Sequence, residues 1–148
     1  MDSSGIHLWL VLMKAYRTLE RHARCSIEPL GLGSSDFAIL ELLLHRGQQP
    51  VNAIGRRVDL TSGAITSAVD RLEAQGLVVR TADAEDRRTR FVSLTPKGTA
   101  RIREVFGVHK RAMEGVTSGL TTAERETLIN LMKKLGRAAE ERLEKGSE

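Results

Sequence analysis

Apolar residues recur at spacings of three and four along most of this chain, a pattern that predicts a mainly helical fold. The first such segment runs from Ile6 to about Ile27 and contains neither glycine nor proline. Its apolar stripe comprises Leu8, Leu12, Ala15, Leu19 and Ala23, and Trp9, Leu10, Val11 and Met13 widen it almost all round at the start. A helix that is apolar on nearly every side has to be covered, and a second subunit is a candidate for the cover.

Three shorter helices follow a break at Pro29, Gly31 and Gly33. We expect them at 35–45, capped by Ser34 or Ser35 with Asp36 in its first turn; at 51–58; and at 62–76, capped by Thr61 or Ser62. The first is strongly apolar and should be central to the core. The other two are joined by a short turn and match the helix-turn-helix unit.

The period then changes from helix to strand. Leu77–Val79 and Arg90–Leu94 are typical of β-strands, and the polar segment 81–89 between them contains no core-forming residue. Two strands around a charged loop, directly after a helix-turn-helix, indicate a wing.

Helix resumes at Thr95-Pro96, with the threonine as cap and the proline at the first helical position. Gly115 and Gly119 predict a bend or break, and Thr121–Glu124 is a capping box that opens a last helix. We expect its inward residues to be Leu128, Leu131, Met132, Leu135 and Ala138, and the charged tail from Glu140 to fray. The fold class is therefore mainly α with a small β wing.

Composition narrows the class of protein. With 148 residues, 41% apolar and 28% charged, the chain fits one compact globular domain. A single cysteine excludes an intrachain disulfide framework and fits a reducing compartment. The longest apolar run, Leu8–Met13, is far below the ~20 residues of a membrane span, and no secretory signal is evident. We expect a soluble cytoplasmic protein with no membrane partner.

The positive charge is concentrated in the middle of the chain. The net charge is +4, and residues 51–101 hold nine basic and six acidic groups, net +3. A local basic field suits a polyanion, although a solvated face would carry the same charges.

Two segments in this region have residue types suited to DNA. On the helix from Ser62, the face opposite Ile65, Val69 and Leu72 is mostly small or hydroxylic in its first half, which suits a major groove about 12 Å wide. An ordinary solvated helix fits too. In the wing, Arg87, Arg88 and Arg90 lie beside Asp83, Glu85 and Asp86. Arginines can enter a narrow minor groove, and the alternative is a self-neutralised cluster of salt bridges.

Leu60–Val78, Asp86-Arg87-Arg88 and Val92–Gly98 together resemble the MarR family of regulators. The resemblance covers nearly the whole chain and implies a dimeric winged helix-turn-helix. Residues 1–33 and 100–148 would be dimerisation helices and residues 34–99 the DNA-binding lobe. It also implies a repressor of a pseudo-palindromic operator, released by a small molecule or an oxidant. Ser35–Gly47 and Val51–Gly55 look most like a branch that regulates quinone and phenol detoxification, which implies an aromatic, phenolic or quinone effector.

Within this resemblance, Arg88 would be the minor-groove finger and Asp86 the residue that orients it. The full set of expected DNA contacts is Thr61, Ser62, Gly63, Thr66, Ser67, Arg71, Asp86, Arg87, Arg88 and Arg90. The resemblance implies that the partner is double-stranded DNA, bound by a homodimer.

The effector site implied by the family is a crevice between the dimerisation helices and the winged-helix lobe. Residues that could line it are Trp9, Met13, Tyr16, Phe37 and Phe106, with Arg17 or His22 for an anionic group. Each aromatic among them could equally be plain core. Cys25, the only thiol, could instead make the protein a redox sensor, or be an inert half-buried residue.

Other functions find less support in the sequence. His22 and Cys25 have the spacing of half a metal site, but a structural zinc site needs four ligands, so we expect no metal and no cofactor. No nucleophile elbow, phosphate-binding glycine loop or zinc-protease motif is present, which argues against an enzyme. A winged helix that binds proteins without binding DNA stays open.

Overall fold

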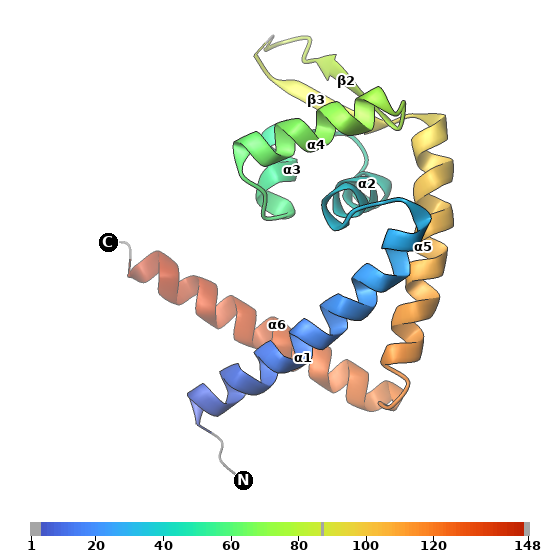
Figure 1. Ribbon diagram of the computed structural model, residues 1–148. Coiled ribbons are helices and arrows are strands. Elements are labelled where there is room, and N and C mark those ends of the chain that lie inside the picture. The colour runs from blue at the N-terminus through green and yellow to red at the C-terminus, as the bar shows by residue number, and fades with distance from the viewer. Residues whose placement is uncertain (1–3, 87, 147–148) are drawn as a thin grey trace. The chain divides into compact units, whose positions relative to one another are not determined.

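The structure is a computed structural model that describes residues 4–86 and 88–146 (Figure 1). The helices are α1 (Gly5–Ile27), the 3-10 turn η1 (Glu28–Leu30), α2 (Ser34–Arg46), α3 (Val51–Arg57), α4 (Ser62–Ala74), α5 (Pro96–Val116) and α6 (Thr122–Lys145). The strands are β1 (Gln49–Pro50), β2 (Val78–Ala82) and β3 (Arg90–Leu94). This architecture confirms a mainly α fold with a small β wing. The chain divides into two compact units, Met1–Met113 and Glu114–Glu148.

The core of the first unit is built around α2, as its apolar sequence predicts. Ile39 and Leu40 are fully buried and Leu43 is nearly so. The buried residues around them come from α3, α4, the sheet and α5, and include Ile54, Ile65, Val69, Leu72, Val78, Val92, Ile102 and Val105. The helix-turn-helix therefore rests on a single apolar cluster that also holds the wing.

The sheet has three antiparallel strands in the order β1-β3-β2. β2 pairs with β3 from Val78 opposite Leu94 to Ala82 opposite Arg90. The sequence predicted that the first wing strand would end at Val79, so the observed strand is longer and the wing loop starts only at Asp83. β1 was not predicted, because two residues that include Pro50 leave no strand pattern.

Helix starts follow the predicted capping chemistry at three of four places, and one of them is α5, where the Thr95 hydroxyl accepts from the Gly98 N–H at 3.0 Å. Thr61 caps α4, and Thr121 forms a capping box with Glu124 at the start of α6. The expected serine cap of α2 was wrong: Gly33 is the N-cap residue, and no side chain bonds there. The predicted break after Gly115 is present, since α5 ends at Val116, whereas α6 continues past Glu140 to Lys145.

A tight junction connects the end of α4 and the start of β2 to the start of α5. The Thr95 hydroxyl donates to the Gly76 carbonyl oxygen at 2.6 Å and accepts from the Gly98 N–H at 3.0 Å. A Cβ atom on Gly98 would lie 1.8 Å from the Leu77 carbonyl oxygen, so only glycine fits this backbone contact. The junction fixes where the wing leaves the helical lobe.

Apolar side chains are exposed on α1 and, separately, on α6. On α1 they are Ile6, Leu8, Trp9, Leu10 and Val11, with Trp9 55% exposed. On α6, Leu128, Leu131, Met132, Leu135 and Ala138 are exposed, so the prediction that they face inward is not met within one chain. Within the described ranges, no helix is both long enough and apolar enough to span a membrane.

Candidate nucleic-acid interface

Helix α4 has the two unlike faces that its sequence predicts. Ile65, Val69 and Leu72 are buried in the core. Ser62, Gly63, Thr66 and Ser67 are exposed on the other side of the helix. Around Gly63 the space is open, with no atom within 4 Å of where a Cβ would lie, so another molecule could approach the backbone closely. The Thr61 hydroxyl accepts from the Ala64 N–H at 3.2 Å and fixes where this face begins.

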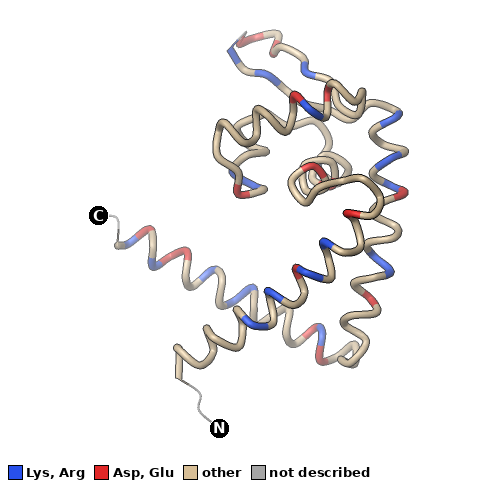
Figure 2. Tube along the Cα trace, in the orientation of Figure 1, with Lys and Arg blue, Asp and Glu red and all other residues tan. Residues whose placement is uncertain are grey.

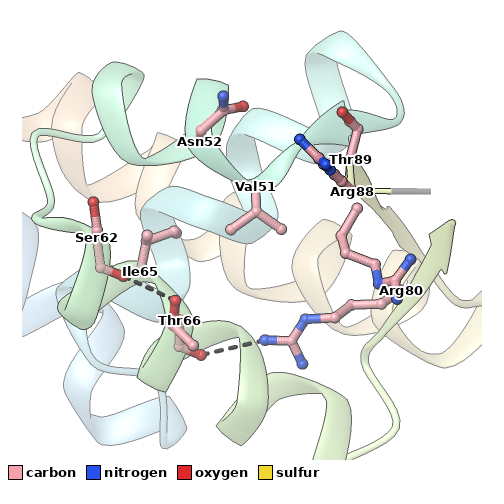
Figure 3. Close-up of a pocket in the computed structure, with 9 residues that line it drawn as sticks. Val51, Asn52, Ser62, Ile65, Thr66, Arg80, Arg88 and Thr89 are labelled. Carbon is pink, nitrogen blue, oxygen red and sulfur yellow. Dashed lines mark hydrogen bonds between the residues drawn. The ribbon is translucent and has the colours of Figure 1, made fainter. Parts of the chain in front are cut away.

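Helix α3, helix α4 and the wing border one hollow, which we call the α4–wing hollow (Figure 3). Its lining residues are Val51, Asn52, Ser62, Ile65, Thr66, Arg80, Arg88, Thr89 and Arg90. The hollow thus brings together predicted contacts from two distant stretches of sequence, two hydroxyls from α4 and two arginines from the wing. Hydroxyl, amide and guanidinium groups are the donors that proteins use on phosphates and base edges.

Asp86 shapes the wing loop through the backbone. One of its carboxylate oxygens accepts from the Arg88 N–H at 2.9 Å and the other from the Thr89 hydroxyl at 3.1 Å. The Asp83 N–H donates to the Thr89 carbonyl oxygen at 3.1 Å and closes the loop. The predicted role of Asp86, holding the Arg88 guanidinium, is therefore replaced by a role in loop conformation.

The structure describes two of the three wing arginines, Arg88 and Arg90. Arg88 is exposed, and within the described part of the chain no carboxylate forms an ion pair with its guanidinium. The salt-bridge alternative for the wing therefore does not apply to Arg88. Arg87 lies outside the described residues. Figure 2 shows that basic and acidic residues both occur along the wing.

Arg71 was predicted to contact DNA, and the structure gives it a partner inside the protein. Its Nε and Nη2 atoms donate to the two oxygens of Asp36 at 3.0 and 2.5 Å. Asp36 is a buried residue on α2, 6% exposed. The hydrogen bond and the charge of this carboxylate raise the pKa of Arg71 above its usual value. The pair ties α4 to α2, and Arg71 is not among the residues that line the α4–wing hollow.

Sequence reasoning missed three polar residues of the hollow, Asn52, Arg80 and Thr89. Arg80 contributed only to the charge count, because the first wing strand was predicted to end one residue before it. Its Nη2 atom lies 2.6 Å from the Asp70 carboxylate, and its backbone N–H donates to Glu73 at 2.9 Å. Side chains alternate along the strand, so Arg80 lies on the same side as the buried Val78 and opposite the exposed Val79. This alternation was the one signal that could have predicted Arg80 beside α4.

The expected effector residues fall into two sets within the first unit. Trp9, Met13 and Arg17 line a hollow alongside α1, and Tyr16 and His22 are exposed on the same helix. The Phe37 ring lies 4.9 Å from that of His109, and the Phe106 ring lies 5.1 Å from that of His45.

The Phe37 ring contacts a titratable group that was not among the expected residues, the imidazole of His109. His109 Nδ1 lies 2.9 Å from the Ser26 hydroxyl, which joins α5 to α1. Burial lowers the pKa of His109, and the charge of Glu41 opposes this only in part.

Cys25 is exposed rather than half-buried. Across residues 4–86 and 88–146, no group of three or more metal-ligating side chains comes together.

Comparison with known proteins identifies the fold and the class. A sequence model described as the MarR family matches residues 30–89. The chain is 37% identical to the HTH-type transcriptional regulator MhqR of Bacillus subtilis over 92% of this chain and 94% of that protein. It is 30% identical to the B. subtilis HTH-type transcriptional repressor MdtR over 88% and 84%. The crystal structure of the transcriptional regulator BldR from Sulfolobus solfataricus superposes with a TM-score of 0.79 at 31% identity, covering 93% and 99%. These relatives are regulators of transcription and not enzymes.

Proposed function

The chain belongs to the MarR family of transcriptional regulators, which bind DNA, and from this premise we propose that it is a homodimeric repressor of a pseudo-palindromic operator. Residues 34–99 form the DNA-binding lobe, and residues 1–33 and 100–148 form the dimerisation region. The name of the relative MdtR, a repressor, favours repression over activation.

The α4–wing hollow is the observation that carries this proposal. The exposed first half of α4 enters the major groove, where Ser62, Gly63, Thr66 and Ser67 meet base edges and phosphates. The wing reaches the neighbouring minor groove with Arg88, beside Arg87 and Arg90. Asp86 acts here by fixing the loop backbone and Thr61 by fixing the start of α4.

The apolar faces of α1 and α6 support a homodimer. Each of these helices exposes a group of large apolar side chains, and such surfaces on a small protein mark association sites. Two copies related by a two-fold axis present two recognition helices, and a palindromic operator has the same symmetry.

A small aromatic effector releases the DNA in this proposal. Trp9 and Met13 supply apolar surface and Arg17 a cation along the hollow of α1, which suits a phenol or an aromatic acid. The exposed thiol of Cys25 keeps a second route open, in which an oxidant or a quinone reacts with the protein directly.

DNA selection from a random duplex library tests the proposal first. The selected sequence should be a pseudo-palindrome, and fluorescence anisotropy should give tight binding with a steep salt dependence, well above that of a scrambled duplex. Equal and weak binding to both duplexes at every salt concentration would contradict the proposal and favour a protein-interaction module.

The same assay separates the two routes of release. A phenol should release operator DNA from the wild type and from Cys25→Ser alike. Release by a quinone or a peroxide that Cys25→Ser abolishes would assign the response to the thiol instead.

A further inference from the structure

Arg80 lies in the α4–wing hollow among the proposed DNA contacts, but its own guanidinium is bonded to the protein. Nη2 lies 2.6 Å from Asp70 Oδ1 and donates to the Thr66 carbonyl oxygen at 3.4 Å. Nη1 lies 3.6 Å from Glu73 Oε1. Figure 3 shows the Arg80 side chain extending from its strand toward Thr66 on α4. The side chain is only 22% exposed, unlike that of Arg88, an exposed residue.

The three partners form one stripe on the recognition helix. Thr66, Asp70 and Glu73 follow one another at spacings of four and three, so they share a face of α4. Glu73 also accepts the backbone N–H of Arg80 at 2.9 Å, so the strand itself is held as well as its side chain. Through this one residue, β2 is attached to α4 between Thr66 and Glu73, in the helix that is proposed to read the major groove.

The electrostatics oppose a phosphate contact by this residue. Two carboxylates already neutralise the guanidinium, and a phosphate would have to displace them or bind beside their negative charges. A planar guanidinium with several donors is suited to bridging two carboxylates and a carbonyl oxygen at once.

We propose that Arg80 is a positioning residue that sets the distance between the recognition helix and the wing. With that distance fixed, Ser62 and Thr66 reach the major groove while Arg88 reaches the minor groove of the same operator. Arg80 itself does not contact a phosphate. This inference rests on the proposed DNA interface and adds a specificity-determining residue to it.

The test uses two substitutions that should act in the same direction only if Arg80 positions the wing. Arg80→Gln removes the cation and Asp70→Asn removes its nearest partner but leaves the cation in place. Arg103→Gln and Glu126→Gln, at exposed positions on α5 and α6, are matched controls for the two charge changes. Asp70 is 62% exposed, so Asp70→Asn keeps the fold even if Arg80→Gln does not.

Anisotropy with the selected operator and its scrambled control gives the binding readout. Exposed ion pairs are modest, so each variant should lower the ratio of operator to scrambled affinity about two- to fivefold. The salt slope should stay unchanged. A slope that falls by about 0.9 in Arg80→Gln, the effect of one lost phosphate contact, would overturn the proposal. Tighter binding of both duplexes by Asp70→Asn, with a steeper slope, would overturn it as well.

Hydrogen exchange of the DNA-free protein gives a readout independent of DNA binding. Amides of β2 should exchange faster in Arg80→Gln and Asp70→Asn than in the wild type and both controls. If the wild type selects an operator but β2 exchanges at the wild-type rate in both variants, the positioning role alone is overturned. A wild type that selects no operator would instead contradict the proposed function, whatever the exchange data show.

Discussion

Arg71 and Asp36 form an ion pair, and removing Arg71 should lower the free energy of unfolding more than removing Asp36. Asp36 is buried, whereas the Arg71 side chain is 50% exposed. Arg71→Gln therefore leaves a buried carboxylate without its cation, whereas Asp36→Asn leaves a guanidinium that can turn toward water. Breaking a fully buried pair costs about 3–5 kcal/mol, and the exposure of Arg71 reduces this to roughly 1.5–3 kcal/mol for Arg71→Gln. For Asp36→Asn we expect about 0.5–1.5 kcal/mol, the worth of an ordinary hydrogen bond.

Urea unfolding followed by the helical circular dichroism signal measures both free energies of unfolding. The protomer concentration has to be fixed across variants, because dimerisation makes apparent stability depend on it. Arg103→Gln, on the exposed side of α5, is the control for loss of a cation. A larger cost for Asp36→Asn than for Arg71→Gln, or no cost for either, would refute the reasoning. If Arg71→Gln left stability intact but reduced the salt slope of operator binding, Arg71 would be a DNA contact after all.

Three further predictions concern the wing, the α4–α5 junction and the half-buried His109. Arg88→Ala should weaken operator binding by about 1–3 kcal/mol while Arg103→Ala does not, and equal affinity of the two variants in anisotropy would contradict the wing's role. Gly98→Ala should lower the free energy of unfolding by about 1–3 kcal/mol, because the new methyl group forces the Leu77 carbonyl aside, and a wild-type urea midpoint would show that the junction yields freely. The lowered pKa of His109 means that the unfolded chain binds its proton more readily, so stability should fall as the pH drops below the ordinary value of about 6.5. His109→Gln should remove part of this fall, and an identical pH dependence of stability in the two proteins would exclude His109 as its source.

Most of the fold could be predicted from the sequence because its determinants are local. The spacing of apolar residues places every long helix, and Thr61 and Thr121 cap helices through bonds to residues three positions away. Predictions failed where the determinant is not local. β2 extends to Ala82 because β3 supplies its hydrogen-bond partners, and β1 exists only through its pairing with Val92 and Phe91.

In the candidate site, too, some features could be predicted from the sequence and others could not. The helical wheel of α4 correctly separates the inner from the outer residues, since that depends on period alone. It cannot show that Arg71 is bonded to Asp36, which lies 35 positions earlier. The prediction for Asp86 failed although its contacts are local, because residue type alone does not show that the carboxylate bonds to the Arg88 N–H and the Thr89 hydroxyl rather than to the Arg88 guanidinium. A charged residue's type and position do not reveal which partner the fold brings to it.

This distinction changes how the basic charge of the middle third should be interpreted. Nine basic residues lie between positions 51 and 101, but several of them are bonded to the protein itself. Arg71 and Arg80 pair with carboxylates, Lys97 donates to the Gln75 carbonyl oxygen at 2.8 Å, and Arg101 donates to the Leu30 carbonyl oxygen. Such groups add to the long-range field that attracts DNA, but they are poorly placed to release counterions by contacting phosphates. In the proposed interface, close binding of DNA therefore depends on fewer cations than the charge count indicates, and Arg88 at the wing is prominent among them.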